Sequence, residues 1–181
     1  ESANRVALLQ QGKIHMAEGL TPDEIVALAK SDTARGVAVR GNQSMWVMIN
    51  NKLAPFDNVK VRQAINHAIN REAIVRDIYH GMMNNWQGVM PSTYPGYEPW
   101  LKYDFDPAKA KQILADAGFP DGFTTAYDAR QVGNYPDVCT VVKQQLEDTL
   151  GIKGDIQTYE SAAGYALFGT SRSAEGDWAL A

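Results

Sequence analysis

The amino-acid sequence predicts an α/β fold in which helices flank a mixed, mostly parallel sheet. Segments with helical periodicity alternate along the chain with short runs of β-branched or bulky apolar residues, and this order is typical of helices that cover a largely buried sheet. The 181 residues are 45% hydrophobic and 21% charged, which is the composition of an ordinary globular domain. No internal repeat or low-complexity segment interrupts the alternation.

The first elements expected are a short helix, a strand and a second helix. Residues Ala3 to Gln11 predict the first helix, and residues Ile14 to Ala17 predict the strand. The second helix begins at Thr21, because a threonine cap, a proline after it and a glutamate three residues later together satisfy free amide groups. We expect this helix to end near Lys30.

Two strands and the most regular helix of the sequence come next. Apolar runs bounded by glycine or asparagine predict strands at Val37 to Val39 and at Met45 to Ile49. After Pro55, apolar residues recur at the i, i+3, i+4, i+7 and i+8 positions that give a helix one apolar face. These residues are Val61, Ala64, Ile65, Ala68 and Ile69. Asn70 then caps a further helix, which a left-handed Gly81 ends.

The region from Met82 to Tyr103 loses the periodicity and predicts a long packed loop. Residues that break regular structure alternate there with aromatic side chains, which favour packing over a disordered linker. The breakers are Pro91, Pro95, Gly96 and Pro99, and the aromatic residues are Trp86, Tyr94, Tyr97, Trp100 and Tyr103.

The C-terminal half repeats the alternation of helices and strands. Asp106 and Pro107 begin a helix that Gly118 ends, and Gly151 closes a later amphipathic helix. The remaining elements expected are a strand at Phe123 to Tyr127, the amphipathic helix from about Val138 to Leu150, a strand at Ile152 to Tyr159, a short helix at Ala162 to Gly169 and the start of a buried strand at Trp178 to Leu180.

Charge and cysteine content exclude several classes of protein. With 17 basic and 21 acidic residues the net charge is −4, and the charges are dispersed, so nucleic acid and anionic membranes are poor partners. The longest apolar runs, such as Trp46 to Ile49, are far shorter than the roughly 20 residues of a membrane-spanning helix. Cys139 is the only cysteine, which excludes an internal disulfide and a C-x-x-C site.

The sequence shows no arrangement of reactive side chains that is typical of an enzyme. His15, His67 and His80 fall in separate elements and outside any H-E-x-x-H motif. Neither the phosphate-binding G-x-x-x-x-G-K-[ST] motif nor the dinucleotide-binding G-x-G-x-x-G motif occurs. Cys139 lies at the apolar face of its helix, where an inert buried thiol is expected. We therefore predict no catalytic residue, no cofactor and no metal site.

One segment carries a specific resemblance to a known family. Residues Pro55 to Ile65 read PFDNVKVRQAI, and Ala68 to Ile74 read AINREAI. This stretch resembles family 5 of the extracellular solute-binding proteins, which serve dipeptide and oligopeptide importers. Supporting segments follow the family's order at Leu9 to Ile14, Ile49 to Asn50, Tyr103 to Lys111, Ala117 to Phe119 and Leu150 to Ile152. His15 and Asn70 stand where the family often has aspartate.

The resemblance covers nearly the whole chain but only the second lobe of the two-lobed family fold. We therefore expect residues 1–181 to be a single periplasmic-binding-protein-like lobe, excised from the C-terminal-lobe portion of a longer protein. The chain opens without a secretory signal and finishes in an apolar run, and both ends agree with this expectation. In such proteins the ligand is enclosed between two lobes joined by a hinge.

The charged residues of the recognised segment are expected to support the fold. Asp57 or Asn58 can cap the helix that follows, because both side chains accept hydrogen bonds from backbone amides. Arg62 and Arg71 sit where their guanidinium groups could tie helix and loop together by fork-like hydrogen bonds.

Candidate ligand contacts lie in loops at the strand ends, where an open α/β sheet binds its ligands. The first loop contains Gly19, and the second leads into Trp46. The third, residues 128–135, contains Arg130, Asn134 and Tyr135. The resemblance implies that Arg130 pairs with the terminal carboxylate of a peptide, and the alternative is a solvated surface arginine. Trp46 could stack on a ligand or pack in the core, and the same two interpretations apply to Tyr135.

Together these inferences predict a binding lobe rather than an enzyme. The expected function is to hold a short peptide and deliver it, with the missing first lobe, to the membrane permease of an ABC-type importer. The expected location is periplasmic or extracellular, with a lipid anchor in the full-length protein as one option. Other solutes carried by relatives, such as an oligosaccharide, an opine, a nickel chelate or haem, stay open, and so does a sensory or interaction module on the same fold.

Overall fold

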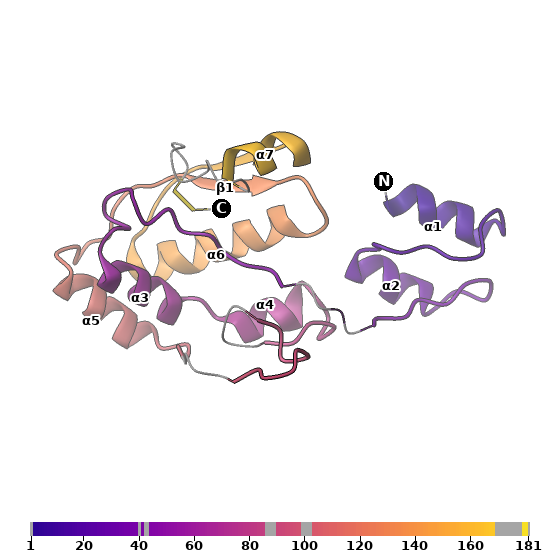
Figure 1. Cartoon of the computed structure of the whole chain (residues 1–181), viewed down its shortest axis with the longest axis horizontal. Coiled ribbons are helices and arrows are strands. Elements are labelled where there is room, and N and C mark those ends of the chain that lie inside the picture. The colour runs from indigo at the N-terminus through magenta and orange to yellow at the C-terminus, as the bar shows by residue number, and fades with distance from the viewer. Residues whose placement is uncertain are drawn as a thin grey trace. The chain divides into compact units, whose positions relative to one another are not determined.

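The computed structural model describes residues 2–39, 41, 44–85, 90–98, 103–168 and 179–180. Its elements are α1 (Ser2–Gln10), α2 (Pro22–Leu28), α3 (Val59–Ala68), α4 (Arg71–Asp77), α5 (Pro107–Asp116), β1 (Tyr127–Arg130), α6 (Tyr135–Leu150), β2 (Ile156–Tyr159) and α7 (Ser161–Phe168) (Figure 1). Contacts between residues divide the chain into two compact units. The first is Glu1–Asn42 with Glu72–Asn85, and the second is Gln43–Arg71 with Trp86–Ala181. That residues 1–181 form a single lobe stays a prediction.

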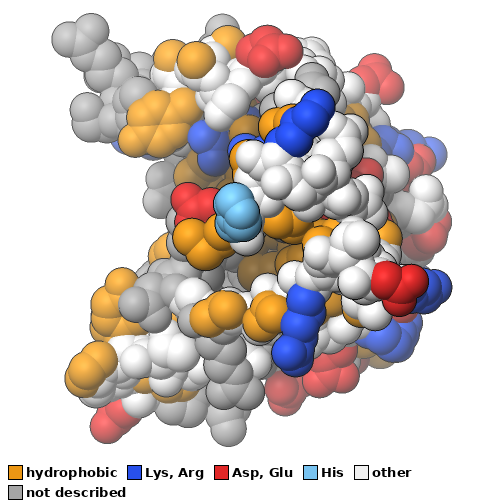
Figure 2. Space-filling view, turned by 90° about the vertical axis from the view of Figure 1, so that its right-hand side faces the viewer, with side chains coloured by type: hydrophobic (Ala, Val, Ile, Leu, Met, Phe, Trp, Pro, Cys, Tyr) orange, Lys and Arg blue, Asp and Glu red, His pale blue; other side chains and the backbone are white. Residues whose placement is uncertain are grey.

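Charged side chains of both signs are interspersed on the face that Figure 2 shows. Basic and acidic groups alternate there with hydrophobic and neutral ones, in agreement with the dispersed charges of the sequence. Among the described residues, no helix is long and apolar enough to cross a membrane.

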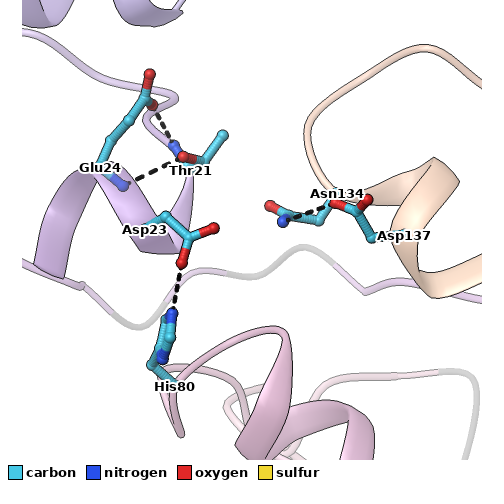
Figure 3. Close-up of polar contacts among 6 residues, drawn as sticks. All are labelled: Thr21, Asp23, Glu24, His80, Asn134 and Asp137. Carbon is cyan, nitrogen blue, oxygen red and sulfur yellow. Dashed lines mark hydrogen bonds and ion pairs between the residues drawn. The ribbon is translucent and has the colours of Figure 1, made fainter. Parts of the chain in front are cut away.

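The first unit contains α1, α2 and most of α4. The predicted capping of α2 is confirmed: the Glu24 amide donates to the Thr21 hydroxyl at 3.3 Å, and the Thr21 amide donates to the Glu24 carboxylate at 2.7 Å (Figure 3). The exposed His80 ring lies 2.7 Å from the Asp23 carboxylate, and Figure 3 draws this contact as a dashed line. Gly81 has the left-handed backbone expected after α4, with a φ of 72°.

Two strands predicted for the first unit are wrong. Residues 14–17 and 37–39 form no strand, and most of their side chains are exposed. An apolar run becomes a strand only when a neighbouring strand satisfies its backbone groups, and no described residue pairs with these segments in a ladder.

The core of the second unit forms where α3 packs against α5 and α6, with α3 and α5 lying side by side in Figure 1. Asn58 caps α3, with its side chain accepting from the Lys60 amide at 2.9 Å, and Asp106 caps α5 in the same way. The predicted apolar face of α3 is confirmed. Its members Val61, Ala64, Ile65, Ala68 and Ile69 are all buried.

Two arginines join α3 to the loops around it, as expected. The Arg62 guanidinium donates from Nη1 to the Phe56 carbonyl at 2.7 Å and to the Asp57 carbonyl at 3.0 Å. Arg71 donates to the Asn66 carbonyl at 3.1 Å and to the Tyr103 carbonyl at 2.7 Å. Both side chains are therefore occupied by the backbone of their own unit, which confirms their structural role.

The predicted loop is confirmed in part: residues 82–85, 90–98 and 103 form neither helix nor strand, but most of the residues at 84–85 and 90–98 are exposed rather than packed. Trp86, Pro99 and Trp100 lie outside the described residues. The end of the loop is fixed to α3 through a buried histidine. His67 Nδ1 donates to the Asp104 carbonyl at 2.8 Å, and the His67 ring meets the Tyr103 ring edge-on at a centroid distance of 5.2 Å.

The described part of the sheet is small and mixed. Strands β1 and β2 are parallel, with Tyr127 opposite Ile156 and Arg130 opposite Tyr159. Leu180 forms a parallel bridge with Tyr127 and an antiparallel bridge with Ile49. Helices α6 and α7 pack against the strands. The α/β arrangement of helices flanking a mixed sheet is thus the one that the sequence predicts.

Strand boundaries in the second unit differ from the predicted ones. Strand β1 begins at Tyr127, where the prediction ended, and β2 starts at Ile156 instead of Ile152. Thr124 and Lys153 form only an isolated bridge before these strands. Residues 44–48 form no strand, although Ile49 bridges Leu180. Trp178 and Gly169, at the ends of two further predictions, lie outside the described residues.

Two glycines allow the turn after α5 to lie against the end of α6. Gly151 ends α6 in the left-handed conformation, with a φ of 67°, as predicted. Gly122 also has a positive φ, 79°, and a Cβ atom there would overlap the Gly151 carbonyl group. Two backbones therefore pass each other at a distance that leaves no room for a side chain.

Candidate functional site

A pocket of about 330 Å³ lies within the second unit, between β1, α6, α7 and the extended segment 44–48. Pockets that bind small molecules commonly begin at about this volume. Apolar groups line much of it, including Met45, Val47, Val138, Val142, Phe168 and Leu180. Arg130 and Asp128 are the charged residues among its lining groups.

The pocket follows from local features of the sequence. Val138 and Val142 lie one helical turn apart on α6, so both side chains point to the same side of the helix. Residues 45–48 are apolar without being paired in a ladder, and they line the pocket instead of extending the sheet. The strand predicted there is wrong, because no described residue pairs with residues 45–48 in a ladder.

Arg130 is the last residue of β1 and contributes a cation to the pocket lining. Its guanidinium carbon lies over the ring of Tyr135 at 5.4 Å and over the ring of Tyr165 at 5.9 Å from the ring centroids. Its stem runs past Gly164, where a Cβ atom would come within 2.5 Å of Arg130 Cγ. No described residue forms an ion pair with this guanidinium.

Asp128 is a buried carboxyl group beside the same pocket. Burial raises the pKa of Asp128, while hydrogen bonds with the Tyr159 hydroxyl and the Ala179 backbone act in the opposite direction. The Asp128 amide also donates to the Leu180 carbonyl at 2.7 Å. The polar groups of Asp128 are therefore engaged by residues of its own unit.

Cys139 lines the pocket as a half-buried, unreactive thiol. Burial, and secondarily the negative charge of Asp128, raise the pKa of Cys139 to about 11. The thiolate is the reactive form, so the thiol predicted to be inert remains protonated near neutral pH. In the described part of the chain, no group of His, Cys, Asp and Glu side chains could hold a metal ion.

Alkylation of Cys139 by iodoacetamide is expected to be much slower than that of free glutathione at neutral pH. Because the thiolate fraction of a thiol with a pKa of about 11 grows with pH, the rate should still be rising at pH 10. Mass spectrometry of the alkylated protein over time measures it. A rate that levels off below pH 9 would contradict the raised pKa.

The structure brings three of the five predicted ligand contacts to one place. Arg130, Tyr135 and Trp46 all line the pocket, and Trp46 is 53% exposed. Asn134 is buried at the start of α6, and its amide nitrogen donates to the Asp137 carboxylate at 3.2 Å (Figure 3). Gly19 belongs to the first unit, where its carbonyl accepts from Arg5 at 2.9 Å. The role of all five as ligand contacts stays a prediction.

Sequence reasoning missed several residues of the pocket. Val138 and Val142 gave a clear signal, but an apolar helical stripe does not tell whether it faces the core or a cavity. Tyr165 gave no signal, because only the folded chain brings α7 next to the end of β1. The same holds for Gly164, which lies beside the Arg130 stem.

Comparison with known proteins agrees with this architecture. Residues 1–181 match the family described as bacterial extracellular solute-binding proteins, family 5 Middle. The chain is 33% identical over 200 residues to a glutathione-binding protein of Salmonella choleraesuis, a match that covers 99% of this chain and 38% of the relative. The glutathione-binding protein of Escherichia coli K12 is 30% identical with the same coverage. The chain thus spans 38% of the length of these relatives.

Solved structures confirm the fold class. The periplasmic binding protein DppA of Helicobacter pylori, in complex with the peptide STSA, has a TM-score of 0.84 and 30% identity, covering 100% of this chain and 35% of that protein. A dipeptide-binding protein of Pseudoalteromonas, in complex with Met-Leu, has a TM-score of 0.77 at 24% identity, covering 99% of this chain and 37% of that one. The predicted periplasmic-binding-protein-like α/β fold is therefore correct.

Proposed function

Because the chain belongs to family 5 of the bacterial extracellular solute-binding proteins, we propose that it is the ligand-binding lobe of a longer protein that delivers short peptides to an ABC-type importer. A relative of known structure holds the peptide STSA and another holds Met-Leu, which supports a peptide as the ligand. The lobe binds its ligand and leaves it chemically unchanged.

One observation carries the proposal: the pocket contains an arginine that no described carboxylate neutralises. A guanidinium stays charged at any working pH and offers parallel N–H donors that match the two oxygens of a carboxylate. Every peptide with a free C-terminus carries such a group. Arg130 is therefore assigned to the terminal carboxylate, and Tyr135 and Trp46 to the ligand surface beside it.

The apolar wall of the pocket supports a ligand that also carries an apolar group. Burying an apolar side chain contributes about 1.5–3 kcal/mol, and Val138, Val142 and Phe168 offer such a surface close to Arg130. A peptide whose last residue is apolar can pair its carboxylate with Arg130 and bury its side chain against this wall. Sugars and other neutral solutes offer Arg130 hydroxyl or carbonyl acceptors but no negative charge to compensate its desolvation, which disfavours them.

The proposal includes two partners, another lobe of the same protein and a membrane permease. The chain spans 38% of the relatives' length, and we assign the rest of the pocket to another lobe of the same protein. The closed form is then presented to the membrane permease of the importer. The family is described as extracellular, and the parent protein is assigned to the periplasm or the cell exterior, with a lipid anchor as part of the proposal.

A pair of peptides that differ only at the terminal carboxylate tests the proposal. The intact protein is expected to bind Ser-Thr-Ser-Ala more than about tenfold more tightly than its C-terminal amide, because the amide cannot form the charge-assisted pair. Titration calorimetry measures both affinities, and mass spectrometry identifies the ligand that co-purifies. Equal affinities, or a co-purifying sugar, would overturn the assignment of a peptide carboxylate to Arg130.

A further inference from the structure

Arg130 is held by aromatic rings, in contrast to the two structural arginines of its unit. Arg62 and Arg71 each donate to two backbone carbonyl oxygens, so their N–H groups are engaged by the protein itself. Arg130 instead lies over the rings of Tyr135 and Tyr165, and no described residue accepts a hydrogen bond from its guanidinium. The three arginines thus differ in which donors remain for a ligand.

A ring holds a guanidinium without using its hydrogen-bond donors. The attraction is between the cation and the electron-rich face of the ring, whereas the N–H groups point outward in the guanidinium plane. A protein carboxylate in the same place would neutralise the charge and compete directly with a ligand carboxylate. Tyrosine rings therefore orient the cation while keeping both its charge and its edge donors available.

Helix α7 lies directly against the Arg130 side chain. Gly164 lies on this helix and has no Cβ atom, which leaves room for the Arg130 stem. A Cβ atom at this position would lie only 2.5 Å from Arg130 Cγ. Tyr165, the next residue, lines the pocket and is 56% exposed. One turn of a short helix thus supplies both the space for the stem and a ring for the guanidinium.

We propose that Tyr135 and Tyr165 are positioning residues that fix the Arg130 guanidinium for a ligand carboxylate, with Gly164 admitting its stem. This inference rests on the proposed function, because it gives the two rings a role in carboxylate recognition. It adds that affinity for the carboxylate depends on the aromatic faces rather than on the tyrosine hydroxyls.

Matched variants of the exposed Tyr165 test the proposal. Tyr165→Phe keeps the ring and should leave the preference for Ser-Thr-Ser-Ala over its amide within about twofold of the wild type. Tyr165→Leu removes the ring and should reduce that preference about fivefold, because the affinity for the acid falls more than the affinity for the amide. A purely structural role would lower both affinities together. Tyr135→Phe and Tyr135→Leu should change the preference for the acid in the same way.

A second measurement needs no ligand. The Arg130 side-chain protons lie over two aromatic rings, so their NMR signals should be displaced by ring currents. The displacement should persist in Tyr165→Phe and shrink in Tyr165→Leu. Gly164→Ala should shift the same signals, because the Arg130 stem must move away from the added methyl group.

The possible outcomes separate the two proposals. If Arg130→Ala abolishes the preference for the acid while both leucine variants retain it, the positioning role is overturned and the peptide function stands. If the wild-type protein shows no preference for the acid, both are overturned. Unchanged Arg130 signals in Tyr165→Leu would overturn the positioning role whatever the binding data show.

Discussion

Arg130→Ala is expected to weaken binding of Ser-Thr-Ser-Ala by the intact protein more than tenfold. A hydrogen bond to a charged group contributes about 1.5–3 kcal/mol, which corresponds to roughly tenfold to more than a hundredfold in the dissociation constant. The variant loses this interaction while keeping the apolar wall, since Val138 and Val142 belong to α6 and not to the arginine. Titration calorimetry measures the change.

Two controls make this result specific to the pocket. Arg76→Ala removes an arginine whose side chain is 73% exposed and which forms an ion pair with the neighbouring Asp77, so peptide binding should not change. Arg130→Lys keeps the charge but loses the parallel donors, and it should bind with an intermediate affinity. Unchanged affinity in Arg130→Ala would remove the residue from the binding site.

Gly122→Ala is expected to lower the free energy of unfolding by about 3 kcal/mol. The backbone of Gly122 has a φ of 79°, which a residue with a Cβ atom adopts only under strain. The new methyl group would also overlap the backbone at Gly151, which cannot move without disturbing the end of α6. Unfolding by urea, followed by circular dichroism, measures the loss.

Gly118→Ala separates the two causes of that loss. Gly118 has a φ of 95°, but a Cβ atom there would meet no other atom within 4 Å. This variant should lose only the conformational part, about 1–2 kcal/mol. If both variants lose the same amount, the close approach of the two backbones does not contribute to stability.

Helices were predictable because their signals are local. Thr21, Asn58 and Asp106 each accept from an amide two or three residues ahead, so a cap can be found within a short window of sequence. Gly151 marks the end of α6 for a similarly local reason. The apolar residues of α3 also recur with a spacing of three or four, which is the period of a helix and not that of a strand.

Strands were less predictable because their partners lie elsewhere in the chain. Residues 37–39 and 45–48 have the composition of strands, yet the former are exposed and the latter line a pocket. The four-residue strand β1 exists because β2 and Leu180 pair with it, and neither is near it in sequence. Composition indicates that a segment can pair, and only the fold decides whether it does.

The candidate site shows the same limit. Arg130 and Tyr135 could be selected because they follow a strand and precede a helix, and the family resemblance gave the arginine a role. Gly164 could not, since its importance arises from the path of the Arg130 stem across α7. A contact between two elements that are separated in sequence leaves no trace in the local pattern of either.

The pairing of Leu180 with both Tyr127 and Ile49 has a consequence for the order of folding. Ile49 and Leu180 stand at opposite ends of the second unit's sequence, so their bridge closes a long loop at a high entropic expense, whereas α3, α5 and α6 form from local interactions. We therefore expect the helical core to assemble early and the pairing of Ile49 with Leu180 to form last. On unfolding, we expect this pairing to be the first part of the sheet to open.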